Sequence, residues 1–186
     1  MKNKNYPLYE ISRPASISDM LRTQAGKMPD AAAFRYRKGR DEIETKTYAE
    51  VLDKVEKTAS WVEQTYGRGS HIAIIGENSY EWIIAFFAIL SSGNVAVPID
   101  KELPASEVAW LINKADVTTV FISKTYSDLV ENIDRLRVMT LKKLQEAEGE
   151  NADTYQLYQP QSDELACIFF TSGTSGRSKG DRKSVV

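Results

Sequence analysis

Residues 71–99 restrict the possible folds of this chain more than any other stretch. His71-Ile-Ala-Ile-Ile75 is a short apolar run that ends in a Gly-Glu-Asn-Ser turn, so it predicts a buried strand. Residues 80–90 are apolar almost all round, which predicts a helix in the interior. Residues 94–99 predict a second strand. A strand, helix and strand with short connections form a βαβ unit, with parallel strands and a right-handed crossover.

The same alternation continues further along the chain. It predicts helices at 104–114, 126–136 and 141–148, the last short and charged, and strands at 117–122 and 137–139. Residues 148–161 are polar without periodicity, which indicates a surface connection. A chain of 186 residues, of which 42% are apolar, can bury one sizeable core. The expected fold class is α/β, a mostly parallel sheet with flanking helices.

The N-terminal residues predict an irregular arm, a helix and a hairpin. Residues 1–15 are polar and contain prolines, so they form the arm. Ser18 and Asp19 open an amphipathic helix that ends before Pro29. Its apolar residues are Met20, Leu21 and Met28. Residues 31–37 and 42–46, joined by a Lys-Gly-Arg-Asp turn, predict a β-hairpin.

A longer helix is expected after the hairpin. Thr47 suits the N-cap position, and Glu50 three residues later completes a capping box. Apolar residues then recur at helical spacing until Gly67: Tyr48, Val51, Leu52, Val55, Ala59 and Val62.

A loop near the C-terminus has the composition of a phosphate-binding site. It follows the apolar run 165–170, which predicts a buried strand. The candidate residues combine glycines, hydroxyl groups and a cation: Thr171, Ser172, Gly173, Thr174, Ser175, Gly176, Lys179 and Gly180. Glycines let the main chain approach an anion closely, while hydroxyls and Lys179 donate hydrogen bonds to it. The spacing differs from that of the common P-loop, and a flexible Ser/Gly linker is the alternative.

Three segments resemble the core motifs of the adenylate-forming superfamily, which includes acyl-CoA synthetases, luciferases and peptide-synthetase adenylation domains. Thr47-Tyr-Ala-Glu-Val51 resembles the first motif, and Leu90-Ser-Ser-Gly-Asn-Val-Ala-Val-Pro-Ile-Asp100 resembles the second. Residues 171–180 resemble the AMP-binding signature, with Ser175 where a threonine is common. Residues 16–180 are therefore expected to be the N-terminal part of an AMP-binding (adenylation) domain.

The resemblance implies an enzyme that activates a carboxylic acid with ATP and Mg²⁺ to form acyl-AMP, and then passes the acyl group to coenzyme A. The candidate loop would bind the β and γ phosphates, with Lys179 assisting. Phe169-Phe170 and Arg177-Ser178 favour a fatty acyl-CoA synthetase. An adenylation domain for an amino or aryl acid and a peptidyl carrier protein is the alternative. The family's Mg²⁺-binding glutamate and catalytic lysine have no counterpart in these 186 residues, so no catalytic or metal-binding residue is assigned and the chain alone is expected to be inactive.

Other classes of function have less support. A non-catalytic nucleotide-binding module is a second alternative. A nicotinamide-binding fold would need a Gly-x-Gly-x-x-Gly turn after the first strand, whereas Gly67-Arg-Gly69 comes before it. A net charge of −2 without a basic stripe argues against nucleic acid as a partner. The single cysteine, Cys167, lies in an apolar run, and the single histidine, His71, has no partners at catalytic spacing. Without a signal region or a membrane-length apolar run, the protein is expected to be cytoplasmic.

The last six residues depart from the family pattern, which usually continues with an apolar residue and a helix. The sequence Asp181-Arg-Lys-Ser-Val-Val186 can be encoded by GAT CGG AAG AGC GTC GTG, the start of a widely used sequencing adapter. We therefore expect residues 181–186 to be a non-native tail on a fragment of a longer protein. A fragment of this kind would leave an unpaired sheet edge beside Ile168, Phe169 and Phe170.

Overall fold

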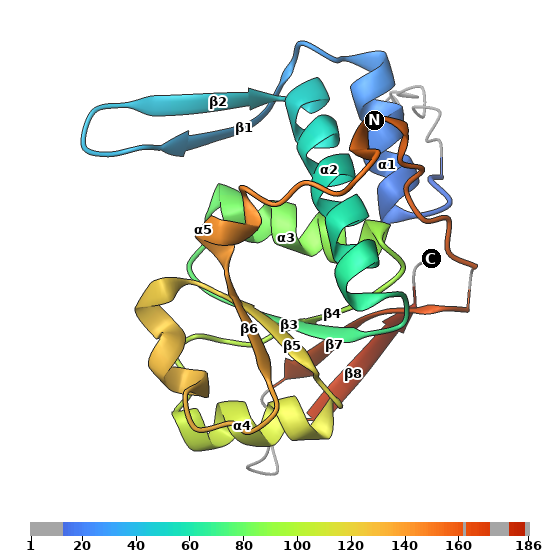
Figure 1. Ribbon diagram of the computed structural model, residues 1–186. Coiled ribbons are helices and arrows are strands. Elements are labelled where there is room, and N and C mark those ends of the chain that lie inside the picture. The colour runs from blue at the N-terminus through green and yellow to red at the C-terminus, as the bar shows by residue number, and fades with distance from the viewer. Residues whose placement is uncertain (1–12, 162, 172–178, 185–186) are drawn as a thin grey trace, which may run out of the picture.

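A six-stranded sheet forms the centre of the protein (Figure 1). The computed structural model describes residues 13–161, 163–171 and 179–184. The strand order is β6-β5-β3-β4-β7-β8. The parallel strands are β3 (His71–Ile75), β4 (Val95–Pro98), β5 (Thr119–Ile122), β6 (Arg137–Thr140) and β7 (Leu165–Thr171). At one edge β8 (Lys179–Ser184) runs antiparallel to β7. The predicted α/β class with a mostly parallel sheet is confirmed.

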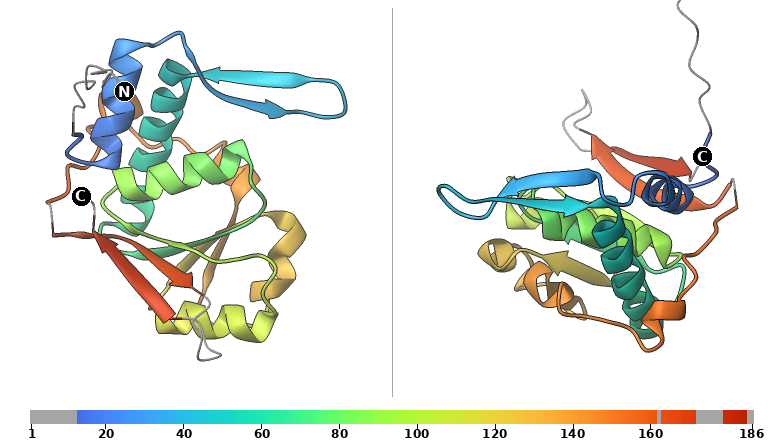
Figure 2. Two further views of the ribbon diagram at one scale, coloured as in Figure 1. Left: turned by 180° about the vertical axis from the view of Figure 1, so that it is seen from behind. Right: turned by 90° about the horizontal axis from the view of Figure 1, so that it is seen from above.

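Helices cover both faces of this sheet. The helix α3 (Tyr80–Ser91) joins β3 to β4, and α4 (Ala105–Lys114) joins β4 to β5 on the other side of β3. Because right-handed crossovers in opposite directions lie on opposite faces, α3 and α4 are separated by the sheet. The helix α2 (Tyr48–Tyr66) lies above α3, so that α3 is enclosed between α2 and the sheet (Figures 1 and 2).

The apolar residues of α3 pack in two directions. Ala85 and Ile89 contact the sheet with Ile72 and Ala96, while Ile84 and Ala88 pack with α2 and α1. A helix buried on both sides needs no polar face, which explains the uniformly apolar sequence. A third cluster, around Val97, Leu111 and Val120, fills the space between the sheet and α4. Among the described residues, no helix has the length and apolar character needed to cross a membrane.

The predicted hairpin and the capped helix after it are confirmed. Strands β1 (Ala32–Arg37) and β2 (Ile43–Thr47) pair antiparallel. Thr47 caps α2 in a reciprocal capping box, in which its N–H donates to the Glu50 carboxylate at 2.7 Å. The hairpin projects from the body beside α2 (Figure 1).

The start of the first helix was predicted two residues too late. The helix α1 (Ile17–Lys27) is capped by Ser16, whose hydroxyl accepts from the Asp19 N–H, and Ser18 lies within the helix. Of the three apolar residues predicted for this helix, only Leu21 is buried, while Met20 and Met28 are exposed. Ser18 is buried instead, where its hydroxyl shares a hydrogen bond with the hydroxyl of Ser91.

Two predicted helices are wrong or too long. Residues 124–130 form a 3₁₀ helix, η1 (Lys124–Val130), rather than a helix at 126–136, and Arg135 adopts a left-handed φ of 62°. Short polar side chains explain the difference because they bond to nearby backbone in competition with the helix, as the Ser127 hydroxyl does to the Lys124 carbonyl. The helix predicted at 141–148 is limited to α5 (Leu141–Leu144).

Residues 149–158, here called the strap, lie at the surface as predicted, and they also pack against α2. The Gly149 N–H donates to the Lys57 carbonyl, and Leu157 is only 2% exposed within the cluster of α1, α2 and α3. A short 3₁₀ turn, η2 (Ala152–Thr154), lies between these two contacts. The polar composition concealed this packing because a single buried leucine produces no periodicity.

The sheet edge beside Ile168, Phe169 and Phe170 is paired, so the prediction of an unpaired edge is wrong. Ile168 lies opposite Arg182 and Phe170 lies opposite Gly180 in the ladder between β7 and β8. The segment that pairs includes residues 181–184 of the predicted tail. Main-chain hydrogen bonds can recruit a polar segment to an edge strand regardless of its side chains.

The hairpin contains an ion cluster whose protonation can be measured. Hydrogen bonds from the Lys46 and Lys38 ammonium groups lower the pKa of Glu44 to about 2. A carboxyl group with a lowered folded-state pKa stabilises the fold above its unfolded pKa, near 4.5, and this contribution disappears as the pH falls towards 2. We expect NMR titration to give a Glu44 midpoint near pH 2, and Lys46→Ala to raise it. A Glu44 midpoint near 4.5 in the unaltered chain would contradict the ion cluster.

Candidate functional site

The predicted phosphate-binding residues lie where β7 ends and β8 begins. Thr171, the last residue of β7, is opposite Lys179, the first residue of β8, and Gly180 is opposite Phe170. Ser172, Gly173, Thr174, Ser175 and Gly176 lie outside the described residues. The structure therefore brings Thr171, Lys179 and Gly180 together at the base of the loop and describes no further part of it.

The base of the loop is at the carboxyl edge of the parallel strands. Because β7 runs parallel to β4, with Cys167 opposite Ala96, Thr171 lies towards the same edge as Ile99 and Asp100. Ligands of open α/β sheets bind at this edge, outside the carboxyl ends of the strands. The location agrees with a binding role for the loop.

The neighbouring strand ends at this edge are closely packed. A side chain added at Gly76, just after β3, would place its Cβ 2.6 Å from the Ser123 hydroxyl and 3.1 Å from Leu141. Ser123 donates a hydrogen bond to the Glu77 carboxylate, and this bond is the main reason why the pKa of Glu77 is lowered. These contacts fix the ends of β3 and β5 and leave no room between them for a ligand.

Acidic and basic residues both follow the strand ends at this edge. Glu77, Asp100 and Glu102 are acidic, whereas Lys124 follows β5 and Lys142 and Lys143 follow β6. Lys101 bonds to Glu102 and lies 5.7 Å from the centre of the Tyr126 ring. Arg177 and Lys179 are the cations that the loop sequence supplies.

Magnesium has no ligand set in the described part of the chain. No group of three or more His, Cys, Asp or Glu side chains in that part could hold a metal ion. Cys167 is buried at the centre of β7, and burial raises the pKa of its thiol to about 11, so the thiolate is disfavoured. His71 begins β3, and its ring nitrogen bonds to the Ala115 carbonyl, a structural contact.

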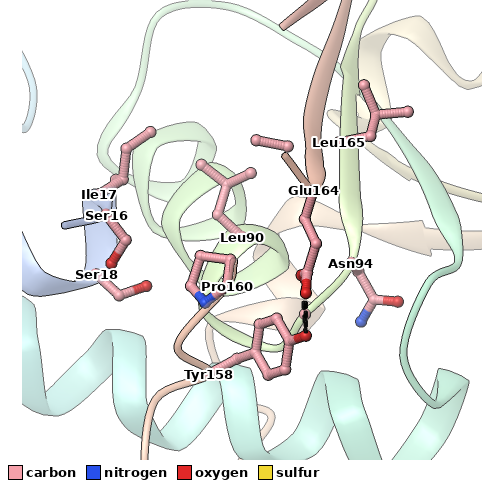
Figure 3. Close-up of a pocket in the computed structure, with 11 residues that line it drawn as sticks. Ser16, Ile17, Ser18, Leu90, Asn94, Tyr158, Pro160, Glu164 and Leu165 are labelled. Carbon is pink, nitrogen blue, oxygen red and sulfur yellow. Dashed lines mark hydrogen bonds between the residues drawn. The ribbon is translucent and has the colours of Figure 1, made fainter. Parts of the chain in front are cut away.

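A small, partly open cavity lies at the opposite, amino edge of the sheet, and Figure 3 shows the residues that line it. Leu90, Asn94, Tyr158 and Glu164 line it, and the Tyr158 hydroxyl donates to the Glu164 carboxylate at 2.9 Å. Its volume is about 30 Å³, which is room for about two water molecules and not for a nucleotide. The sequence pattern did not indicate this cavity because its lining comes from four separate segments.

Asn94 and Arg68 connect the elements around this cavity. The Asn94 side chain bonds to the Gly67 carbonyl, the Ser70 N–H and the Ser92 hydroxyl. Arg68 pairs with Glu63 at 2.8 Å and stacks over the Tyr158 ring at 4.9 Å. The two residues hold α2 and the strap against the amino ends of the strands.

Comparison with known proteins identifies the family. A model of a protein family described as "AMP-binding enzyme" matches residues 21–180, so the matched region ends at the last residue of the candidate loop. The chain belongs to the AMP-binding enzyme family. Its relatives are adenylate-forming enzymes, as the resemblance in the three motifs implied.

One curated relative of this AMP-binding chain is a peptide synthetase. Tyrocidine synthase 1 of Brevibacillus parabrevis is 27% identical over 179 residues, which cover 95% of the chain and 16% of the synthase.

Two solved structures show the fold. A fatty acyl-adenylate ligase from L. pneumophila, in complex with acyl adenylate and pyrophosphate, has a TM-score of 0.75 at 20% identity and covers 92% of the chain and 30% of the ligase. O-succinylbenzoate coenzyme A synthetase from Bacillus subtilis, in complex with AMP, has a TM-score of 0.74 at 22% identity and covers 88% of the chain and 41% of the synthetase. The AMP-binding chain thus spans well under half the length of each of these three proteins.

Proposed function

We propose that this chain is the N-terminal part of an enzyme that joins a carboxylic acid to AMP, with the loop 171–180 binding the β and γ phosphates of ATP. The observation that carries the proposal is the position of the loop within the family match and within the fold. The family match includes the loop, and Thr171 lies opposite Lys179 at the carboxyl edge of the sheet. Donors placed in advance at this edge would stabilise the charge that develops as pyrophosphate leaves.

The chemical purpose of adenylation is to improve a leaving group. A carboxylate reacts poorly with a thiol because the departing oxide is strongly basic. Attack of the carboxylate on the α-phosphorus of ATP releases pyrophosphate and forms an acyl-AMP, from which AMP departs readily. The chain's own contribution is to hold the phosphates with Thr171, Lys179 and the hydroxyls between them. Magnesium would be held by the phosphates together with the family's Mg²⁺-binding glutamate, which has no counterpart in the 186 residues.

Two acceptors for the acyl group are each supported by a particular likeness. Coenzyme A as the acceptor is supported by the fold shared with the coenzyme A synthetase. A fatty acid as the acid that is activated is supported by the fold shared with the acyl-adenylate ligase. A peptidyl carrier protein is supported by the identity with tyrocidine synthase 1. The two can be separated by offering the complete enzyme either thiol after adenylation of its preferred acid.

The phosphate-binding role can be tested on the 186-residue chain by titration with ATP. Lys179→Ala is expected to weaken ATP binding about tenfold or more, because it removes a charge-assisted hydrogen bond to phosphate. The matched control is Lys114→Ala, a change at the last residue of α4 and away from the loop. Equal ATP affinity in the Lys179→Ala variant and in the unaltered chain would refute the assignment of the loop.

Catalysis requires a separate measurement. We expect the 186-residue chain to show no carboxylate-dependent exchange of labelled pyrophosphate into ATP, because the family's catalytic lysine and Mg²⁺-binding glutamate have no counterpart in it. A longer protein that contains them should show the exchange. Exchange above background by the 186-residue chain itself would contradict this division of roles.

A further inference from the structure

The outer edge of strand β2 is an open pairing surface. In the hairpin the Lys38 N–H donates to the Glu42 carbonyl, so these two residues form a hydrogen-bonded pair. This pair determines which of the following residue pairs in the hairpin are hydrogen-bonded. Antiparallel pairs alternate between hydrogen-bonded and non-hydrogen-bonded, so the N–H and C=O groups of Ile43 and Thr45 point away from β1. In the described part of the chain, β1 is the only strand that pairs with β2.

This edge is also turned away from the body. In Figure 1, β1 lies between β2 and the helices α3 and α5. Phe34, Arg35 and Tyr36 of β1 line a cavity with the start of α3, whereas no residue of β2 does. The Ile43 side chain at the start of β2 is 63% exposed, although it is apolar and large. Lys46 of β2 lies 5.9 Å from the centre of the Tyr80 ring, and α2 follows directly after Thr47, so a second strand would approach β2 from the side away from β1.

The sequence of β2 is complementary to itself when reversed. Ile43-Glu-Thr-Lys-Thr47 has Glu44 and Lys46 at equal distances on either side of Thr45. If a second copy pairs antiparallel around Thr45, Glu44 lies opposite Lys46 of the other copy, and Lys46 lies opposite Glu44. The two Thr45 residues exchange main-chain hydrogen bonds at the centre. The pairs of opposite charge occupy the non-hydrogen-bonded positions, where side chains are closest.

The charges also favour the register centred on Thr45. A displacement by two residues is the smallest slip that keeps both hairpins facing the same way, because side chains alternate between the two faces. A slip in one direction places Glu44 opposite Glu44, with Glu42, which precedes β2, opposite Lys46. A slip in the other direction places Lys46 opposite Lys46. Only the register centred on Thr45 places no like charges of β2 opposite one another. Pairing through β1 is less favourable, since pairings centred on Arg35 or Tyr36 bring arginines opposite one another. Opposed like charges destabilise a strand pair.

We propose that β2 pairs with β2 of a second copy of this chain, forming a continuous sheet in the order β1, β2, β2, β1 around a two-fold axis at Thr45. The pairing is short because the Thr47 N–H already donates to Glu50. The dimer is therefore weak, in the range of transient contacts well below the usual interface size. This inference concerns a surface remote from the loop 171–180 and does not depend on the proposed function.

Charge reversal tests the pairing directly by sedimentation velocity and NMR diffusion. We expect the unaltered chain to dimerise as its concentration rises towards about 1 mM. Glu44→Lys and Lys46→Glu should each weaken dimerisation about tenfold or more, because both cross-strand pairs become repulsive. An equimolar mixture of the two single variants should dimerise again, because positions 44 and 46 are then both lysine in one chain and both glutamate in the other.

The mixture distinguishes pairing between copies from damage within one copy. Glu44 also bonds to Lys38 and Lys46 of its own chain, at 3.1 Å and 2.7 Å, so each single variant loses internal contacts that mixing cannot restore. The double variant Glu44→Lys with Lys46→Glu restores the pairs between copies and the internal pair between positions 44 and 46, although not the pair with Lys38, and should dimerise by itself. A chain that stays monomeric at about 1 mM would overturn the proposal. A dimer whose stability is unaffected by the single changes would also overturn it, because dimerisation would then use another surface.

Discussion

Asn94→Ala is expected to lower the free energy of unfolding by about 3 kcal/mol. Asn94 is only 3% exposed, and its side chain accepts from the Ser70 N–H at 2.8 Å. Its amide group donates to the Gly67 carbonyl and the Ser92 hydroxyl, both at 2.9 Å. Removal of the side chain leaves these groups without their partners in a largely buried place. Each such loss costs about 1–3 kcal/mol, and water can compensate in part at the exposed Gly67 and the partly exposed Ser70 but not at the buried Ser92.

Chemical denaturation of both chains measures this cost. Asn113→Ala is the matched control, because the Asn113 side chain makes one hydrogen bond, to the Ala109 carbonyl of its own helix at an exposed position. We expect the control to change stability by less than about 0.5 kcal/mol. A similar effect for the two changes would show that the bonds of Asn94 contribute no more than a surface bond.

Asn94 also shows which features of this fold a sequence pattern can and cannot reveal. The strands β3 and β4 and the enclosed helix α3 were predictable, since continuous apolar runs of suitable length report burial on all sides. The capping box of Thr47 was predictable because both partners lie within one helical turn. Asn94, by contrast, joins two loops, and its partners are as far as 27 residues away. No local pattern encodes contacts of that kind.

The same distinction applies to the candidate site. The composition of residues 171–180 predicts a phosphate-binding loop, which stays a prediction, and the apolar run before it was enough to predict the strand β7. The pairing of β8 with β7 could not be predicted, because residues 179–184 contain no apolar alternation. Their strand conformation follows from hydrogen bonds to β7, whose position is set by the rest of the sheet. The grouping of Glu77 with Asp100 and Lys101 could not be predicted either, because these residues follow two different strands and meet only in the folded sheet.

Gly149→Ala is expected to cost about 3 kcal/mol of stability, because the strap would have to leave α2. A Cβ atom at residue 149 would lie 2.3 Å from the Ser60 hydroxyl and 2.6 Å from the Trp61 backbone nitrogen. Since the backbone of α2 cannot yield, residue 149 must move. Movement would break the two bonds between Gln64 and the Glu150 main chain, at 2.8 Å and 2.9 Å.

The control for this change is Gly26→Ala in α1, where an added Cβ meets no atom within 4 Å. Alanine there should leave stability unchanged or raise it by up to about 1 kcal/mol, because glycine disfavours a helix interior. Denaturation of both chains by urea compares the two glycines directly. A loss in the Gly26→Ala variant as large as that in Gly149→Ala would show that any added methyl group is harmful, whatever its surroundings.

A second substitution tests whether the cost of Gly149→Ala arises from displacement of the strap. Gln64→Ala alone removes both bonds to Glu150 and should destabilise the chain by about 1–2 kcal/mol. If the strap has already left α2 in the Gly149→Ala chain, those bonds no longer exist there, and Gln64→Ala should add little. The coupling between the two changes should therefore be close to the full effect of Gln64→Ala. Additive effects would mean that residues 149 and 150 move independently, and that the clash at residue 149 is relieved without displacing the strap from α2.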